Sequence, residues 1–247
     1  MREIVMLAVD LHAHTLMSQC GIHSHLEMLN AARERGLAGL AITDHGPALR
    51  GRHPSPVYER LKQPVPGIRF IKGIEANVTD ADGTVDVPAW LLPMLDIVLL
   101  GLHVRFALPH GSDDWTDALI AAMRRNPWVD IITHPVDENF PMDLERLANE
   151  ARELGIALEL NNSKVLYRRT TPEAIARFLA ICRDAGCKVA VCSDAHTVDE
   201  IGGDESVRPL LEASGIDESH VVNASAGTAF GFIAARRAAR LAHIRKL

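Results

Sequence analysis

Short apolar runs recur along the whole chain and alternate with amphipathic segments. Seven of these runs predict strands, at residues 5–11, 37–43, 68–74, 97–102, 129–133, 156–160 and 188–192. Most are nearly continuous in hydrophobicity, which is typical of strands that helices cover on both faces. Helical spacing appears between them, for example at Leu144, Leu147, Ala148, Ala151 and Leu154. Strands that alternate with helices predict parallel β–α units.

Nearly every predicted strand ends in a histidine or a carboxylate. The segments are Asp10-Leu11-His12-Ala13-His14-Thr15, Ile42-Thr43-Asp44-His45, Gly73-Ile74-Glu75-Ala76-Asn77, Leu100-Gly101-Leu102-His103, Ile132-Thr133-His134-Pro135 and Cys192-Ser193-Asp194-Ala195-His196. A closed barrel brings its strand ends to one mouth, whereas an open sheet spreads them along an edge. No glycine-rich phosphate loop follows any strand. We therefore predict an α/β, TIM-like barrel with a multinuclear metal site at the carboxyl ends of its strands.

Length, composition and charge are typical of a soluble globular protein. The 247 residues fit a single domain, 1–247, and 47% of them are hydrophobic. A net charge of -6 argues against binding to long nucleic acid. No apolar stretch reaches membrane length and no signal peptide is evident, so we expect a cytoplasmic protein. The basic stretch at residues 236–246 is interpreted as the solvated face of a terminal helix, and homo-oligomer formation stays open.

The residues at the strand ends have the donor atoms and the spacing of metal ligands. His12 and His14 are two apart, so both imidazoles face the same way on an extended chain, and Asp194 and His196 repeat this spacing. Glu75 ends an apolar run, where a carboxylate requires a cation, and we predict that it bridges two metals. The other predicted ligands are His45, His103 and His134, with one more from Cys20, His23 or His25. This mixed ligation fits two or three divalent ions of zinc, manganese or iron.

Three polar residues near the strand ends are predicted to support these ligands. Glu159 and Asn161 point the same way at the end of the sixth strand and are expected to hydrogen-bond to ligand histidines, which fixes the tautomer. Asp10 shares the face of His12 and His14. The alternatives are that residues 161–162 only form a turn and that each single histidine is a hydrogen-bonded core residue. Their shared position relative to the strands favours metal ligation.

The same segments resemble the motifs of the PHP (polymerase and histidinol phosphatase) superfamily, from residue 7 to about 230. The resemblance rests on Asp10-Leu11-His12-Ala13-His14-Thr15, Ile42-Thr43-Asp44-His45-Gly46-Pro47, Gly73-Ile74-Glu75-Ala76-Asn77, Ile132-Thr133-His134-Pro135 and Ser193-Asp194-Ala195-His196-Thr197. The chain is most similar to the stand-alone bacterial YcdX-like phosphatases, also through Leu160-Asn161-Asn162-Ser163. The resemblance implies a distorted (βα)7 barrel that holds three metal ions, often zinc.

The resemblance also implies how the ligands are shared among the three ions. The first metal would be held by His12, His14, Glu75 and Asp194, the second by Glu75, His103 and His134, and the third by His45, His196 and one loop ligand. Cys20 stands six residues past His14, where the similar phosphatases carry histidine. A thiolate binds zinc, so Cys20 can take that place. The alternatives are His23, His25 or a weak third site.

These observations predict metal-dependent hydrolysis of a small phosphomonoester, with a metal-activated hydroxide as the nucleophile. The catalytic candidates are Asp194, His196 and His110, of which Asp194 or His110 would protonate the leaving group. The candidates for binding the substrate phosphate are Arg50, Arg52, Arg105, Lys164, Arg168 and Arg169.

Three alternative functions remain open from the sequence. A phosphodiesterase or exonuclease acting on nucleotides would use the same chemistry, but scarce aromatic residues disfavour stacking of long strands. Amide or lactone hydrolysis on a related barrel would use a carbamylated lysine, here Lys72, although Glu75 occupies the ligand position. A non-catalytic accessory module stabilised by its metals is the third alternative.

Overall fold

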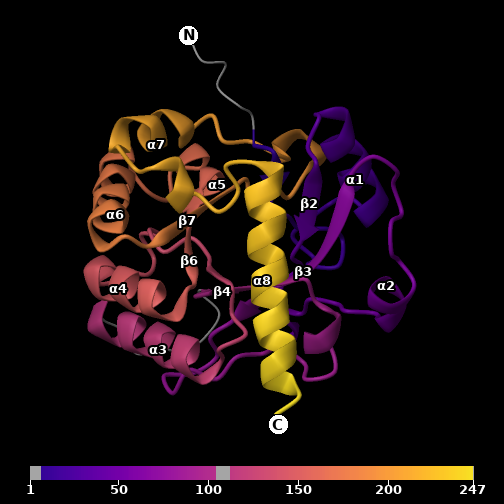
Figure 1. Cartoon of the computed structure of the whole chain (residues 1–247), viewed down its shortest axis with the longest axis horizontal. Coiled ribbons are helices and arrows are strands. Elements are labelled where there is room, and N and C mark those ends of the chain that lie inside the picture. Colours follow the sequence, from indigo (N-terminus) through magenta and orange to yellow (C-terminus); the bar gives the residue numbers. More distant parts are fainter. Residues whose placement is uncertain (1–6, 104–111, 247) are drawn as a thin grey trace.

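The computed structural model describes residues 7–103 and 112–246, and these residues form a sheet of seven parallel strands (Figure 1). The strands pair in sequence order and are β1 (Val9–Asp10), β2 (Gly39–Ile42), β3 (Arg69–Asn77), β4 (Ile97–Gly101), β5 (Ile131–Ile132), β6 (Ala157–Asn161) and β7 (Lys188–Cys192). All seven predicted runs contain a strand, although β1 and β5 are only two residues long.

The sheet curves until its two edge strands meet. Beyond β1 and β7 the chain forms a parallel bridge between Ala13 and Ala195. Below this bridge, the Asn223 side chain donates to the carbonyl of Val9 at 3.0 Å and accepts from the amide of Val191 at 3.0 Å. A side-chain amide therefore supplies hydrogen bonds between two strands whose backbones do not pair directly. The predicted α/β, TIM-like barrel is confirmed.

Helices cover the outside of the barrel (Figure 1). They are α1 (His25–Glu34), α2 (Ser55–Glu59), α3 (Ser112–Arg125), α4 (Leu144–Leu154), α5 (Asn162–Leu166), α6 (Pro172–Ala185), α7 (Arg208–Ser214) and α8 (Ala226–Ile244). Short 3-10 turns lie at Pro47–Leu49, Leu92–Met94, Val198–Glu200 and Glu218–His220. Capping residues in the sequence set the ends of these helices. At the start of α6, the Thr171 side chain accepts from the amide of Ala174, and Pro172 is the first helical residue. Over the described residues, we found no helix with the length and hydrophobicity that a membrane span requires.

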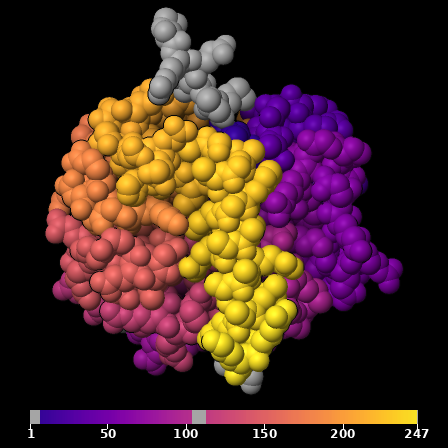
Figure 2. Space-filling view, viewed as in Figure 1, coloured from indigo at the N-terminus to yellow at the C-terminus, as the bar shows by residue number. Residues whose placement is uncertain are grey.

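The strands are buried on both faces, which explains their continuous apolar runs. Leu99 of β4 packs in the barrel interior, whereas its neighbour Leu100 packs outside, in the cluster that includes residues of α3, α4 and α6. Phe232 and Ile233 of α8 belong to the interior cluster, so α8 closes one end of the barrel. In Figure 2, α8 forms a band across this face, between the first part of the chain and its later helices.

The basic stretch of α8 was predicted to face solvent, but two of its arginines do not. The Arg240 side chain is fully buried, and its guanidinium donates to Asp130 Oδ2 at 2.7 Å and to the carbonyl of Leu95 at 2.8 Å. Arg236 Nε donates to the other oxygen of Asp130 at 3.0 Å. Asp130 and Leu95 precede β5 and β4, so α8 is anchored at the amino ends of the strands. The interpretation of a solvated face was therefore wrong for Arg236 and Arg240.

Candidate metal centre

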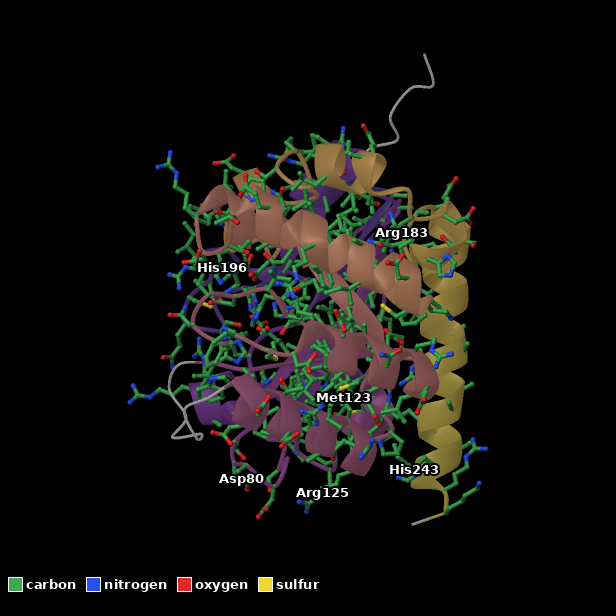
Figure 3. The ribbon with its side chains drawn as sticks, turned by 90° about the vertical axis from the view of Figure 1, so that its left-hand side faces the viewer. Asp80, Met123, Arg125, Arg183, His196 and His243 are labelled. Atoms are coloured by element: carbon green, nitrogen blue, oxygen red, sulfur yellow. The ribbon has the colours of Figure 1, made fainter. Side chains whose placement is uncertain are left out.

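The predicted ligands gather at the carboxyl ends of the strands, opposite α8. They follow β1 (His12, His14), β2 (His45), β4 (His103), β5 (His134) and β7 (Asp194, His196), or lie in β3 (Glu75). Figure 3 places the labelled His196 on the side of the barrel away from α8. Parallel strands deliver their ends to the same rim, which is why residues from distant parts of the sequence meet here.

Glu75 lies at the middle of the cluster and is 1% exposed. Its Oε1 is 3.0 Å from His134 Nε2 and 3.4 Å from His103 Nε2. Its Oε2 is 2.8 Å from His45 Nδ1 and 3.5 Å from His12 Nε2. Burial by itself would raise the pKa of Glu75, but the neighbouring histidines hold that pKa well below its usual range. The carboxylate therefore stays charged, with its two oxygens facing different imidazoles.

A second carboxylate, Asp194, faces the two histidines that follow β1. His12 Nε2 and His14 Nε2 are 3.0 Å apart, and Asp194 Oδ1 is 3.5 Å and 3.3 Å from them, respectively. Both imidazoles thus face one space, as their spacing of two residues predicts. Burial would raise the pKa of Asp194, but the two histidines hold it well below its usual range. Asp194 is therefore ionised among these histidines, and its role as leaving-group acid stays a prediction.

At the outer side of the cluster, a thiol joins three imidazoles. The Sγ atom of Cys20 and one ring nitrogen each of His14, His45 and His196 all lie within 4.8 Å of one another. Burial would raise the pKa of the Cys20 thiol, but hydrogen bonds to His196 and His45 lower it to about 6. His23 and His25 are not part of this group among the described residues, and His25 Nε2 instead lies 4.0 Å from Asp44.

The donor set fits divalent cations. Two ligand atoms around tetrahedral zinc lie roughly 3.3 Å apart when the Zn–N bonds are about 2.0–2.1 Å. Many donor pairs in the cluster are separated by 3.0–3.5 Å. Among the described side chains, Glu75 Oε2, His45 Nδ1 and both ring nitrogens of His103 are buried without a hydrogen bond. Glu75 Oε2 and His45 Nδ1 are 2.8 Å apart yet not aligned for a hydrogen bond, whereas a shared cation would account for their approach.

Residues behind the cluster hold the imidazoles in place. Glu159 Oε1 lies 2.6 Å from His12 Nδ1, which leaves Nε2 of that ring directed at the cluster. The other oxygen of Glu159 accepts from the amide of His134 at 2.6 Å. Asn161 was predicted to hydrogen-bond to a ligand histidine. Its side-chain amide instead donates to the carboxylates of Glu159 and Asp194. The predicted supporting contact is thus made by Glu159, and Asn161 orients carboxylates.

Comparison with known proteins identifies the family of the chain. The model of the PHP domain family matches residues 10–191. The chain belongs to the PHP domain family. A probable phosphatase of Caldanaerobacter subterraneus is 37% identical over 225 residues, covering 89% of this chain and 88% of the relative. A probable phosphatase of Citrobacter koseri is 35% identical over 235 residues, covering 94% and 96%.

The fold of this PHP protein is also similar to solved structures. Histidinol phosphate phosphatase of Lactococcus lactis, complexed with zinc, L-histidinol and phosphate, gives a TM-score of 0.62 at 15% sequence identity. The alignment covers 85% of this chain and 95% of that enzyme. The likeness supports the barrel fold, and the family membership together with the donor cluster supports the use of divalent metal.

A cavity of about 580 Å³ opens beside the metal cluster of this PHP protein. It is lined by Ser163, Lys164, Tyr167, Arg169, Asp194, His196 and Glu200. Lys164 and Arg169 are the predicted phosphate ligands that line it. Sequence reasoning missed Glu200, whose Oε2 accepts from the amide of His196 at 2.7 Å. Thr197 and Glu200 form a capping box, and this sequence pattern is the signal that could have indicated the local position of Glu200.

Three of the other predicted substrate residues are not part of this cavity. Arg50, Arg52 and Arg168 do not line this cavity, and the Arg52 guanidinium donates to the carbonyl of Leu16 at 3.2 Å. The predictions for Arg105 and His110 concern residues outside the described ranges.

Two residues of the cluster have strained backbones. His134 and Asp194 have positive φ angles of 34° and 55°. Such conformations cost a side chain of this kind about 1–3 kcal/mol and persist where the surrounding structure enforces them. Both residues lie two positions after the last residue of a strand, β5 and β7, so two ligand positions of the candidate site carry backbone strain.

Gly101 allows two ligand rings to approach β4, and its replacement by alanine is expected to impair the site. A Cβ atom there would lie 2.2 Å from Thr133 Oγ1, 3.2 Å from His134 Cε1 and 3.3 Å from His103 Cε1. We expect Gly101→Ala to lower metal content and phosphatase activity, measured by elemental analysis and by hydrolysis of p-nitrophenyl phosphate. Gly231→Ala in α8 is the matched control, because nothing lies within 4 Å of its added Cβ. Equal metal content in both variants would contradict this prediction.

Proposed function

We propose that this protein hydrolyses a small phosphomonoester at a site of two or three divalent cations. Its class, a phosphatase, is confirmed by relatives of that name that align over about nine tenths of both chains. The observation that carries the proposal is the buried donor cluster around Glu75, which borders a cavity that also contains Lys164 and Arg169. Cations and a small cavity side by side suit an anionic substrate.

The donors would be divided among the cations by their positions. His12, His14, Glu75 and Asp194 would hold the first ion, and Glu75, His103 and His134 the second. The contacts of the two Glu75 oxygens support its bridging role. His45 and His196 would hold a third ion at the outer side. Imidazole and carboxylate donors suit zinc, manganese or iron.

The bound cations and several residues of the chain would have distinct roles in the reaction. Bound cations would supply positive charge for the phosphoryl oxygens and would lower the pKa of a water molecule. Glu159 keeps His12 in one tautomer through its contact with Nδ1.

Lys164 is a cationic side chain of the cavity that interacts with the carboxylates of Asp137 and Asp194. Its Nζ lies 3.0 Å from Asp137; burial would lower the pKa of Lys164, but Asp194 and Asp137 raise it, so its positive charge is maintained. Lys164 and Arg169 would therefore attract and orient the phosphate.

The alternative functions are less well supported. The net charge of -6 and the cavity of about 580 Å³ favour a small molecule over a nucleic-acid strand. Lys72 donates to the carbonyl of Tyr58 and lies near Asp96, away from the donor cluster, so it is badly placed for a carbamylated-lysine mechanism. An accessory module would not need a cation-lined cavity beside its metals.

The experiment that tests this function compares two substrates and two metal states. We expect the purified protein loaded with Mn²⁺ or Zn²⁺ to hydrolyse p-nitrophenyl phosphate. Bis-p-nitrophenyl phosphate should react much more slowly. Treatment with a chelator should abolish activity, and added metal should restore it. A clear preference for the diester would favour the phosphodiesterase alternative, and inactivity of the metal-loaded protein on a panel of phosphomonoesters would reject the proposal.

Arg169→Ala is expected to weaken substrate binding. Hydrogen bonds to charged groups contribute about 1.5–3 kcal/mol, so loss of this guanidinium should raise KM roughly 10-fold or more, with a smaller change in kcat. Steady-state kinetics on p-nitrophenyl phosphate measure this effect. Arg152→Ala, an exposed arginine of α4 outside the cavity, is the matched control. An unchanged KM in Arg169→Ala would remove Arg169 from the substrate site.

A further inference from the structure

The loop that carries Cys20 is tied to the barrel on several sides. Its backbone hydrogen bonds join Leu16 to His23 at 2.9 Å, Ile22 to His196 at 3.3 Å and Arg52 to Met17 at 2.9 Å. Ser18 Oγ donates to Asp44 at 2.6 Å, directly beside His45. The turn itself is tight, since a Cβ at Gly21 would lie 2.6 Å from the carbonyl oxygen of Thr15. The position of the thiol is thus set by the fold of the loop.

The three imidazoles around this thiol come from three different strand ends. The ring centroids of His14 and His45 are 4.5 Å apart, and those of His14 and His196 are also 4.5 Å apart. All four donor atoms lie within 4.8 Å of one another. His45 Nδ1 is buried without a hydrogen bond and lies 2.8 Å from Glu75 Oε2, so the His45 ring lies between the thiol and the inner carboxylate.

We propose that Cys20, with His45 and His196, forms a thiolate-containing site that selects thiophilic cations such as Zn²⁺ over Mn²⁺ or Mg²⁺. The other two donor groups, His12–His14–Glu75 and His45–Glu75–His103, contain only imidazole and carboxylate. Thiolate is a soft ligand that favours zinc, whereas oxygen donors suit manganese and magnesium. One thiolate and two imidazoles would provide three of the four ligands that zinc prefers and would leave one position open.

This inference rests on the proposed metal-dependent function. It implies that the positions of the cluster differ in the metals that they bind. The inner positions would accept several divalent metals, and the outer position would retain zinc. His196 lines the substrate cavity as well as the outer donor group, so the zinc-selective position is the one beside the substrate.

A spectroscopic experiment tests the site without relying on activity. The protein is stripped of metal and titrated with Co²⁺, which reports thiolate ligation through a charge-transfer band in the near ultraviolet. We expect the band in the wild-type protein and its loss in Cys20→Ser. Gln19→Gly, an exposed neighbour in the same loop, should keep it. Zinc content should fall by one ion per chain in Cys20→Ser, with manganese content unchanged.

A second measurement needs no variant. Cys182, Cys187 and Cys192 are buried, whereas Cys20 is exposed, so iodoacetamide should alkylate Cys20 selectively in the folded protein. We expect Zn²⁺ to protect Cys20 from alkylation and Mn²⁺ to protect it much less, as measured by mass spectrometry. Equal alkylation with and without zinc, or a cobalt band that persists in Cys20→Ser, would overturn the thiolate site. A protein that shows the band and the protection but hydrolyses no phosphomonoester would instead refute the proposed function alone.

Discussion

Glu75→Gln is expected to reduce kcat/KM for p-nitrophenyl phosphate by more than about 100-fold and to lower the bound metal per chain. Residues that only support metal ligands typically contribute about 10–100-fold, so a proposed bridging ligand should contribute more. Glutamine keeps the shape of the side chain but replaces one acceptor oxygen with an NH₂ group. The contact of Oε2 with His45 at 2.8 Å, or that of Oε1 with His134 at 3.0 Å, would therefore be lost as a ligand position.

The control for this variant carries the same change of charge at a remote place. Glu145 is exposed on α4, and Glu145→Gln should keep wild-type kinetics and metal content. Thermal unfolding of both variants separates loss of the site from loss of the fold. Wild-type activity and metal content in Glu75→Gln would show that Glu75 is not a metal ligand.

Arg240→Ala is expected to destabilise the fold by about 3–5 kcal/mol, because it removes a fully buried side chain and one of the two arginines that pair with a buried carboxylate. Asp130 and Arg240 are both fully buried and their charged atoms are 2.7 Å apart. Arg236 would remain as the other cation near Asp130, at 3.0 Å. For a chain of this size, the loss corresponds to a decrease in Tm of roughly 6–20 °C. Chemical denaturation followed by circular dichroism gives the free energy of unfolding directly.

Arg245→Ala provides the comparison, because Arg245 is exposed at the end of α8 and should change stability by less than about 0.5 kcal/mol. Arg240→Met tests the reason for the effect. It restores apolar volume but not the charge, so it should remain clearly less stable than the wild type. A Tm equal to that of the wild type in Arg240→Ala would mean that α8 is held by its apolar face alone.

The strand pattern was readable because a buried parallel strand needs apolar residues on both faces. Leu99 and Leu100 show this need in adjacent positions, one inside and one outside the barrel. The site residues were readable for a related reason. A histidine or carboxylate directly after such a strand must lie at the rim formed by the carboxyl ends of the strands. Prediction of the strand ends therefore also predicted the site residues.

Loop residues could not be assigned in this way. Arg52 and Arg169 are the same residue type, both in connections after strands, yet only Arg169 lines the cavity. Cys20, His23 and His25 are close in sequence, and the turn at Gly21 decides which of them faces His45 and His196. In each case the position depends on backbone hydrogen bonds to distant segments.

The order of strands and helices and the convergence of the strand-end donors could be predicted from the chain alone, since hydrophobic periodicity is local and the β–α unit repeats along the chain. The tertiary structure alone decided which loop side chains meet those donors and which charges are buried. Arg240 shows why: its burial depends on Asp130, which lies 110 residues earlier in the chain, and no local pattern records a pairing over that distance.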